Sequence, residues 1–523
     1  MFLLQTYAKR AMQISCFAFF ALLAACQERK ETGANLAADS LRIVTSFRVQ
    51  SLEPVRPASY FLTEFALAEL PLMLNAEGKL EPHLLESFTR IDERNWRLTL
   101  RPNVRFQNGK PLTAAAMAAA MNRQLQLSAS AKAVLPDTIV KVSGEHELTL
   151  TTTLPDPTVP AALADELVFP IYDVEAVEAA NGDSAKLIAC GCFTGPYRAV
   201  SLDERELRMA RFDDYWQGRP PLAEVSIRFI GDPQARVLAV QNDEADVALY
   251  PPSEAQQMLA GTTNAFFVAH PRSHGGPRIL PNLRRAPFDE VAVRRAFSLS
   301  LNYESLARDV MEGIGETATG YYPLAYPWAV QNQKTDLAEA RRLLDDAGWL
   351  AGRDGVRVKN NQPLEITLLV YPQQPDWANI ATAMQAQLAE AGFRLRIRQV
   401  EDINAAMKSQ SDWHCSINSP GLVTTGGAPD PFLREHLHSR GERNFGGVRD
   451  AELDRLLDEL GSTFEDARRS EILRRIQQIV IAEKVYEMRP VFLRSRVVVG
   501  KRWRGYKPSP QLHHITWETK PAT

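Results

Sequence analysis

The most reactive side chains in the sequence belong to five cysteines, and two of these are separated by a single residue. Cys190 and Cys192 flank Gly191. A pair at this spacing could close a small disulfide ring in an oxidising compartment, or supply two thiolates to a metal ion. A Cys-x-Cys pair alone is weak evidence for either, and we expect ordinary reduced, partly buried thiols. Five cysteines in 523 residues do not amount to a disulfide framework.

Catalytic motifs are absent from the sequence. It contains no Gly-x-Ser-x-Gly, no His-Glu-x-x-His and no Ser-x-x-Lys with supporting partners, and its nine histidines are scattered without a ligand cluster. The 60 lysines and arginines nearly balance 63 aspartates and glutamates, so nucleic acid is an unexpected partner. We therefore expect a binding protein without a cofactor of its own, and not an enzyme.

The N-terminus has the pattern of a secretory leader. Lys9 and Arg10 precede an apolar stretch over residues 11–25, which is shorter than the ~20 residues that span a bilayer. The ending Leu-Ala-Ala-Cys26 resembles a bacterial lipobox, in which the chain is cut before the cysteine and the thiol carries lipid. We expect a signal peptide over residues 1–25, lipidation of Cys26 and a polar tether over 26–40. A plain signal peptide is the alternative.

Three strand-helix-strand units then alternate along the chain, which is typical of α/β sheets covered on both faces. In the first unit we expect a strand at 41–45 and a helix at 60–74. In the second, strands at 225–230 and 245–250 flank a helix at 233–241. In the third, strands at 364–370 and 394–400 flank a helix that ends at Gly392.

In such sheets, ligands bind outside the carboxyl ends of the parallel strands. This rule needs no knowledge of a family. It points to Ser46 and Phe47, to Gly231 and Asp232, and to Tyr371 and Pro372.

The segments between these units predict two lobes. Alternating patterns over residues 96–100 and 140–152, with a tight turn at Asn108-Gly109, indicate a β-rich insertion. We expect lobe I over residues 41–275, with this subdomain at about 80–195, lobe II over 276–485, and a return to lobe I over 486–523. The Pro-, Gly- and Arg-rich stretch 270–287 is the expected hinge. A ligand held between hinged lobes is the natural mechanism.

Seven stretches, in order, resemble one family. They are LEPHLLESF (80–88), WRLTLRPNVRFQNGKPLTA (96–114), TGPYRAV (194–200), YWQGRPPLAEVSIRFI (215–230), FDEVAVRRAFSLSLN (288–302), DLAEARRLLDDAGW (336–349) and NFGGVRDAELDRLLDEL (444–460). The family is the bacterial extracellular solute-binding family 5, the oligopeptide, dipeptide and nickel receptors of ATP-binding-cassette importers. The resemblance implies a two-lobed periplasmic binding protein, a clamshell with a β-rich subdomain on the first lobe. It also implies a membrane-tethered monomer that serves a permease and its ATPase.

The resemblance narrows the ligand. In peptide-binding members, an aspartate shortly before an Asp-Pro-x-x-Phe-like stretch binds the peptide's amino group, because an ammonium needs a charged acceptor once water is excluded. That position falls near Thr425 here, and the nearby carboxylate is Asp430. This departure counts against ordinary dipeptide or oligopeptide binding, which remains the alternative, together with a ligand sensor that does not transport.

The stretches YPQQPDWANIATAMQAQLAEAGF and TTGGAPDPFL are more similar to the nickel and opine-type metallophore branch. Such ligands call for arginines, aromatic walls and a histidine for the metal. The expected ligand-binding residues are Ser46, Phe47, Tyr371, Trp377, Asn418, Thr425, Arg434 and Asn444, with His436 and His438 as metal ligands. His414 is expected to pack within its strand, and His513 and His514 to lie on the surface.

Overall fold

The computed structural model describes residues 39–56, 59–75, 78–409, 411–419, 428–509 and 513–522. The chain divides into two units, Met1–Ser40 and Leu41–Thr523, and the fold reported below is that of the second. The expected leader, Cys26 and the tether up to residue 38 lie outside the described residues. In the described part of the chain, no helix is both long and apolar enough to cross a bilayer.

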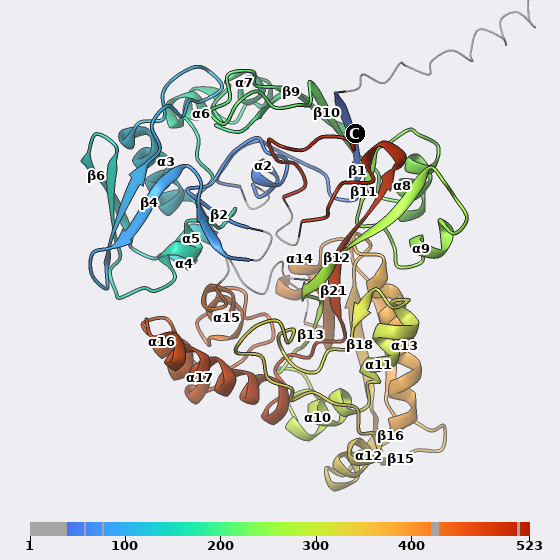
Figure 1. Cartoon of the computed structure of the whole chain (residues 1–523). Coiled ribbons are helices and arrows are strands. Elements are labelled where there is room, and N and C mark those ends of the chain that lie inside the picture. Colours follow the sequence, from blue (N-terminus) through green and yellow to red (C-terminus); the bar gives the residue numbers. More distant parts are fainter. Residues whose placement is uncertain are drawn as a thin grey trace, which may run out of the picture. The chain divides into compact units, whose positions relative to one another are not determined.

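A twisted sheet with hydrophobic clusters on both faces forms the centre of lobe I (Figure 1). Its strand order is β12-β21-β11-β1-β10-β9-β8. Along β1, Ile43 faces one hydrophobic cluster and Val44 faces another, because successive side chains point to opposite faces of a sheet. The strands are β1 (Ser40–Thr45), β8 (Tyr197–Leu202), β9 (Glu206–Arg211), β10 (Glu224–Phe229), β11 (Val247–Leu249), β12 (Ala265–Gly275) and β21 (Phe492–Gly500), and β14 (Gly315–Glu316) pairs with β21.

The first predicted helix is much shorter than the sequence pattern indicates. The helix α2 covers Phe61–Glu64, and the expected continuation to residue 74 is replaced by a turn and by β2 (Leu72–Leu74). Ala66 has a left-handed φ of 56°, which ends the helix. The carbonyls of Ala66 and Leu67 then accept hydrogen bonds from Tyr197 and Gly195 instead of continuing the helical ladder. Tertiary pairing therefore overrides the amphipathic pattern.

The predicted β-rich insertion is an antiparallel sheet in the order β4-β5-β7-β6. Trp96, Leu98 and Leu100 of β5 point into the core while Arg97 points outward, which is the alternation that predicts a half-buried strand. Thr113 caps the following helix, since its hydroxyl accepts a hydrogen bond from the N–H of Ala116 at 3.1 Å. The elements are β3 (Leu80–Pro82), β4 (Leu85–Arg90), β5 (Asn95–Leu100), α3 (Ala114–Leu127), α4 (Ala129–Val134), β6 (Ile139–Gly144), β7 (Glu147–Thr151), α5 (Val159–Ala162), α6 (Val174–Ala180) and α7 (Ser184–Ala189).

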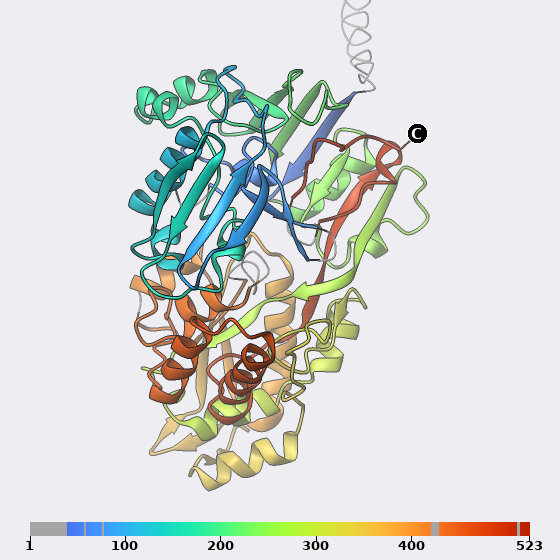
Figure 2. The same cartoon turned by 60° about the vertical axis from the view of Figure 1, so that its left-hand side comes forward.

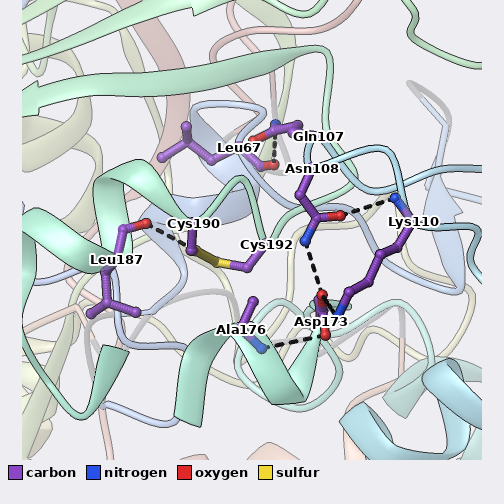
Figure 3. The surroundings of a disulfide bond; sticks show 9 residues. All are labelled: Leu67, Gln107, Asn108, Lys110, Asp173, Ala176, Leu187, Cys190 and Cys192. Carbon is purple, nitrogen blue, oxygen red and sulfur yellow. Dashed lines mark hydrogen bonds and ion pairs between the residues drawn. A yellow bond between two sulfur atoms is a disulfide. The ribbon is translucent and has the colours of Figure 1, made fainter. Parts of the chain in front are cut away.

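Cys190 and Cys192 form a disulfide at the end of α7, so the expectation of reduced thiols is wrong (Figure 3). Packing explains the proximity of the sulfurs. The carbonyl of Gly191 accepts a hydrogen bond from the N–H of Asn108 at 2.8 Å, which presses the Cys-Gly-Cys turn against the 107–109 loop. Asn108 also donates to Asp173 at 2.9 Å. The disulfide closes a small ring within this turn, and the hydrogen bonds of Asn108 attach the turn and α6 to the 107–109 loop.

Lobe II contains a second, smaller sheet, in the order β13-β20-β18-β19. The strand β18 is parallel to both β19 and β20. The helix α13 crosses between β18 and β19 and ends at Gly392, whose φ of +94° gives the left-handed stop predicted from the sequence. The elements are β13 (Arg278–Pro281), β18 (Glu365–Val370), α13 (Asp376–Ala391), β19 (Arg394–Gln399), α14 (Ile403–Ser409) and β20 (Cys415–Asn418).

The remaining helices and short strands lie mainly in lobe II. A bundle of α15, α16 and α17 has its own hydrophobic cluster. The elements are α9 (Ala255–Met258) and α8 (Pro233–Gln241) in lobe I, and α10 (Val291–Leu299), α11 (Tyr303–Ser305), α12 (Leu337–Asp346), β15 (Leu350–Ala351), β16 (Arg357–Lys359), β17 (Gln362–Pro363), α15 (Asp430–Leu437), α16 (Ala451–Leu460) and α17 (Asp466–Gln477) in lobe II.

The hydrophobic clusters separate the two lobes. One cluster draws on the chain up to Leu249 and again from Val497, and another spans Ile279 to Val491. The paired strands β12 and β21 run from one lobe to the other (Figure 2). Because Val491 still packs in the second core, we propose residues 276–491 as lobe II, with the return at residue 492 and not at 486.

Candidate functional site between the lobes

The carboxyl ends of β1 and β18 face one another across the lobes. The hydroxyl of Ser46, directly after β1, donates a hydrogen bond to the carbonyl of Gln373 after β18, at 3.3 Å. Tyr371 also follows β18, and its hydroxyl accepts a hydrogen bond from the N–H of Ser419 at 3.4 Å. The strand-end rule therefore selects residues that the structure brings to one place.

A second cross-lobe contact is charged. Asp376 is the first residue of α13 in lobe II, and it accepts a hydrogen bond from the N–H of Ser253 in lobe I at 2.9 Å. The other oxygen of Asp376 pairs with Arg496 of β21. The carboxylate lies at the positive end of the helix dipole, so the ion pair and the dipole both stabilise it. These contacts fix the base of α13 to lobe I.

Aromatic rings surround the strand ends on the lobe I side. Phe47 packs edge-on against Tyr250, with ring centroids 5.0 Å apart. Tyr250 in turn meets His514, with centroids 6.1 Å apart. Tyr60 lies within electrostatic reach of Tyr371 from lobe II, and burial raises the pKa of the Tyr60 hydroxyl. The rings of Phe47, Tyr60 and Tyr250 keep part of their surface accessible, as expected of residues that line an enclosed space.

Two glutamates face these rings. Burial raises the pKa of Glu64, the last residue of α2, to about 8. Burial and the negative charge of Glu64 together raise the pKa of Glu166 well above its usual value. The charges of both carboxylates also act on the Tyr250 hydroxyl, whose pKa is raised chiefly by burial. Two carboxylates so close in a dry environment cannot both ionise at neutral pH without a cation beside them.

The neighbouring Asp165 faces lobe II. Burial raises its pKa to about 7, the N–H of Leu167 opposes that rise, and the charge of Glu435 adds to it while the guanidinium of Arg443 opposes it. Glu435 and Arg443 form an ion pair at 3.1 Å. Charged groups of both lobes therefore meet beside Glu166.

Glu64 and His514 are buried without partners. Glu64 is 1% exposed, and its Oε2 has no hydrogen-bond partner in the described residues. His514 is 6% exposed, and neither ring nitrogen finds a partner there. The expectation that His514 lies on the surface is therefore wrong, and His513 is partly buried. Burial lowers the pKa of His513 to about 4 and of His514 to about 3, so both rings are neutral at pH 7.

Two predicted ligand residues have structural partners instead. Trp377 is 2% exposed and packs in the hydrophobic core of lobe II. Asn418 accepts a hydrogen bond from Nε of Arg278 at 3.0 Å, inside a buried network in which Arg278 also pairs with Glu487. Trp377 therefore supports α13, and Asn418 positions Arg278. His414 is held within its lobe as expected, since its Nδ1 accepts from the N–H of Thr367 at 2.9 Å.

The predicted metal ligands His436 and His438 do not converge. His436 lies on α15, stacks on Phe432 with centroids 4.2 Å apart, and its Nδ1 contacts the carbonyl of Phe432 at 3.0 Å. His438 follows the helix and lies 3.4 Å from a carboxylate oxygen of Asp458. Apart from the gaps stated above, residues 39–522 hold no three His, Cys, Asp or Glu side chains placed to bind a metal ion.

The remaining predicted residues lie away from the aromatic rings. Arg434, also on α15, lines a small cavity with Asp156 and Thr158 of lobe I. Asn444 holds a turn, donating to the carbonyl of Val448 at 2.9 Å. Thr425 lies outside the described residues. The structure thus brings Ser46, Phe47 and Tyr371 together and adds four residues that the sequence did not single out: Tyr60, Glu64, Glu166 and Tyr250.

Comparisons with known proteins identify the family and the fold. The model of the bacterial extracellular solute-binding proteins, family 5, matches residues 79–444. The nickel-binding protein NikA of Staphylococcus aureus is 24% identical over 406 residues, covering 77% of this chain and 79% of NikA. The nickel-binding periplasmic protein of Escherichia coli is 26% identical over 468 residues, covering 85% of this chain and 87% of its own length.

Solved structures confirm the predicted two-lobed α/β periplasmic binding protein fold. Staphylococcus aureus NikA in complex with Ni(L-His)2 superposes with a TM-score of 0.81 at 22% identity, covering 92% of this chain and all of the other. The oligopeptide-binding protein AppA of Bacillus subtilis, in complex with a nonapeptide, gives 0.77 at 20% identity over 92% of this chain and 98% of the other. At these identities the likeness concerns the fold alone.

Proposed function

The chain belongs to the bacterial extracellular solute-binding proteins of family 5, and on that premise we propose that it captures a nickel-chelate or peptide-like solute between its lobes. Proteins of this family present small solutes to the permease and ATPase of ATP-binding-cassette importers, so the chain is a binding component. We propose that the protein then delivers the solute to the permease, because opening of the two lobes there would release a solute that lobe closure holds.

One observation carries this proposal. Ser46 of lobe I donates a hydrogen bond to Gln373 of lobe II at 3.3 Å where β1 and β18 end, and a ligand that contacted Phe47 and Tyr371 at the same two strand ends would hold the lobes together. Tyr371 is surrounded by protein and yet keeps part of its surface accessible, and burial raises the pKa of its hydroxyl. A ligand at this position stabilises the closed arrangement through its contacts to both lobes.

The names of the relatives support a nickel chelate over other solutes. Two of them are nickel-binding proteins, and one was solved with nickel held by histidine. A chelate brings its own metal ligands, so the absence of a three-residue metal set in the described residues does not exclude it. Ordinary peptide binding is the second candidate, and the fold shared with a nonapeptide receptor favours it. A sensor without transport would use the same lobes.

We also propose that the chain is a lipoprotein. The Leu-Ala-Ala-Cys26 ending supports lipid attachment, which would keep a monomeric receptor near its permease on the outer side of the cytoplasmic membrane.

Isothermal titration calorimetry with nickel(II)–L-histidine and with a dipeptide tests the proposed capture. Tyr371→Ala is expected to weaken binding of the preferred solute by about thirtyfold, the roughly 2 kcal/mol typical of a truncated buried aromatic. Tyr371→Phe is the matched control and should retain most of the affinity, because it keeps the ring. Failure of both solutes to bind, or equal binding by the alanine variant, would contradict the proposal.

A further inference from the structure

We propose that Glu64 and Glu166, walled by Tyr60 and Tyr250, form a subsite in lobe I that binds an organic cation, namely a protonated amine of the solute. The inference rests on the proposed capture of a solute between the lobes, and it specifies the chemistry of one end of that solute. It also supplies a carboxylate acceptor where the sequence lacks the aspartate expected near Thr425.

The burial of Glu64 is the first step of the argument. The side chain is 1% exposed, and Oε2 has no partner among the described residues. A buried carboxyl oxygen without a hydrogen bond costs on the order of 1–3 kcal/mol, so it is expected to have a partner in the working state of the protein. No arginine or lysine lies among the groups that perturb Glu64 or Glu166. Because Glu166 is hydrogen-bonded by Thr63, the unfilled acceptor is Oε2 of Glu64, and a cationic group of the ligand would fill it.

The second step is the direction in which the carboxylates face. Glu64 and Glu166 act on each other and on Tyr250, and Glu64 acts on Tyr60. Glu166 is surrounded by protein and yet keeps part of its surface accessible, as do both tyrosines. Contacts place the groups around α2: the N–H of His514 donates to the main-chain carbonyl of Glu64 at 2.9 Å, and the His514 ring lies 6.1 Å from that of Tyr250. The side chain of Thr63, the residue before Glu64, hydrogen-bonds Glu166. Tyr371, at the end of β18 in lobe II, lies within electrostatic reach of Tyr60.

The chemistry of the walls favours an amine over a bare metal ion. The described residues hold no three His, Cys, Asp or Glu side chains placed to bind a metal ion, so the pair makes a poor metal site. Aromatic faces, in contrast, attract an ammonium group electrostatically. Phe47 and Tyr250 provide such faces beside the carboxylates. His514 is neutral, and its unpartnered ring nitrogens can accept a further N–H.

The ionisation state of Glu64 and Glu166 is expected to change when the ligand binds. The titratable groups that act on the pair or on its walls are Asp165, which precedes Glu166, Tyr60 before α2, Tyr250 after β11 and Tyr506, while His514 of the C-terminal segment contacts Glu64 through its main chain. With the pKa of Glu64 at about 8, the ligand-free pair holds a proton at pH 7. An arriving ammonium favours the ionised carboxylate, so binding releases a proton and affinity rises with pH up to about 8.

The test measures binding of matched amines to the purified protein by calorimetry. The probes are putrescine with N,N′-diacetylputrescine, glycylglycine with N-acetylglycylglycine, and nickel(II)–L-histidine. We expect an amine to bind the wild type, its acetylated form to bind at least about 30-fold more weakly, and Glu64→Gln and Glu166→Gln to cause a similar loss. Glu224→Gln, an exposed glutamate of β10, is the control and should leave affinity unchanged.

Melting temperatures separate binding from folding. The glutamine variants keep the volume of a protonated glutamate, so they should unfold at or above the wild-type temperature. Their affinity for the amine probes should nevertheless fall. Equal amine affinity in wild type and glutamine variants, or equal affinity for acetylated probes, overturns the subsite. Binding of nickel–histidine without any amine also overturns the subsite and leaves the proposed solute capture standing. Failure of every probe contradicts both.

Discussion

Asp376 of lobe II accepts a hydrogen bond from the main-chain N–H of Ser253 in lobe I, and the two atoms are 2.9 Å apart. The same carboxylate pairs with Arg496 of β21, and the side chain of Asp376 is 1% exposed. Because removing one partner leaves a buried charge uncompensated, Asp376→Ala should lower the free energy of unfolding by about 3–5 kcal/mol. Urea denaturation measures this loss.

The control for this contact lies on the surface. Asp213→Ala removes a carboxylate whose ion pair with Arg219 is exposed on both sides, and it should cost less than about 1 kcal/mol. A loss at Asp376 no larger than that at Asp213 would show that the cross-lobe ion pair does not stabilise the fold.

A buried network in lobe II gives the second prediction. Glu487 pairs with both Arg278 and Arg489, and all three side chains are at most 1% exposed. Glu487→Gln leaves two guanidinium groups without a counter-charge, so we expect a loss of about 3–5 kcal/mol in unfolding free energy. The half-exposed pair of Glu316 with Arg494 is the control, and Glu316→Gln should cost under about 1 kcal/mol. Similar losses for both variants would contradict the account of this network.

The pH dependence of stability tests the environment of Glu64. Its pKa is about 8 in the fold against 4.5 as its ordinary value, so the folded state holds the extra proton between these pH values. Stability of the ligand-free protein must then fall as pH rises through this window. His513 and His514 have lowered pKa values of about 4 and 3, and they act with the opposite sign below pH 6.5.

The two histidines do not contribute between pH 6.5 and 8, where Glu64 alone should cost roughly 1.5 kcal/mol. Glu166 and, up to about pH 7, Asp165 add to this loss because their pKa values are also raised. Glu64→Gln should make the slope shallower, and Asp165→Asn should change it only up to about pH 7. Melting curves across this pH range measure the effect, and a slope unchanged in Glu64→Gln would show that Glu64 does not titrate there.

The disulfide predicts a thiol count. Cys190 and Cys192 are bonded and Cys415 is the free, buried cysteine among the described residues. If Cys26 carries lipid, denatured protein without reductant should react with one equivalent of thiol reagent, and with three after reduction. The ring closed by the disulfide is short, so replacing both cysteines by serine should cost only about 1–2 kcal/mol. Three reactive thiols before reduction would contradict the bond.

The lipid anchor is tested by Cys26→Ala. Without the acylated thiol the protein should move from the membrane pellet to the soluble fraction, since no other segment of the sequence is long and apolar enough to hold it. A variant that still sediments with membranes would contradict lipidation at Cys26.

The sequence could predict where the parallel strands end, which follows from sheet topology. It predicted few of the side chains that lie between those strand ends. Ser46, Phe47 and Tyr371 do follow the ends of β1 and β18, because the ends of buried strands can be predicted from the local pattern, and their role in binding stays a prediction. Glu64 was missed because FLTEFALAEL reads as an amphipathic helix, in which Glu64 and Glu69 look alike. In the fold, Glu69 bonds Tyr215 and Trp216, whereas Oε2 of Glu64 has no hydrogen-bond partner among the described residues.

Long-range packing explains the other failures. His513 and His514 looked like surface residues near a chain end, but the C-terminal segment returns to α2, where the N–H of His514 donates to the carbonyl of Glu64 at 2.9 Å. His436 and His438 looked like a loop pair, but α15 turns His436 onto Phe432 and leaves His438 beside Asp458. No spacing within the sequence encodes these contacts between distant segments.

The central claim is that a small solute is held between the lobes, and native mass spectrometry of the protein from its own host, with elemental analysis, tests it most directly. We predict one non-covalently bound solute that carries a free amine. If the ligand is a chelate, this solute also contains nickel or another metal. A metal-free mass of peptide size would favour the second candidate. Protein of bare chain mass that takes up neither nickel–histidine nor any small amine or peptide would contradict the account.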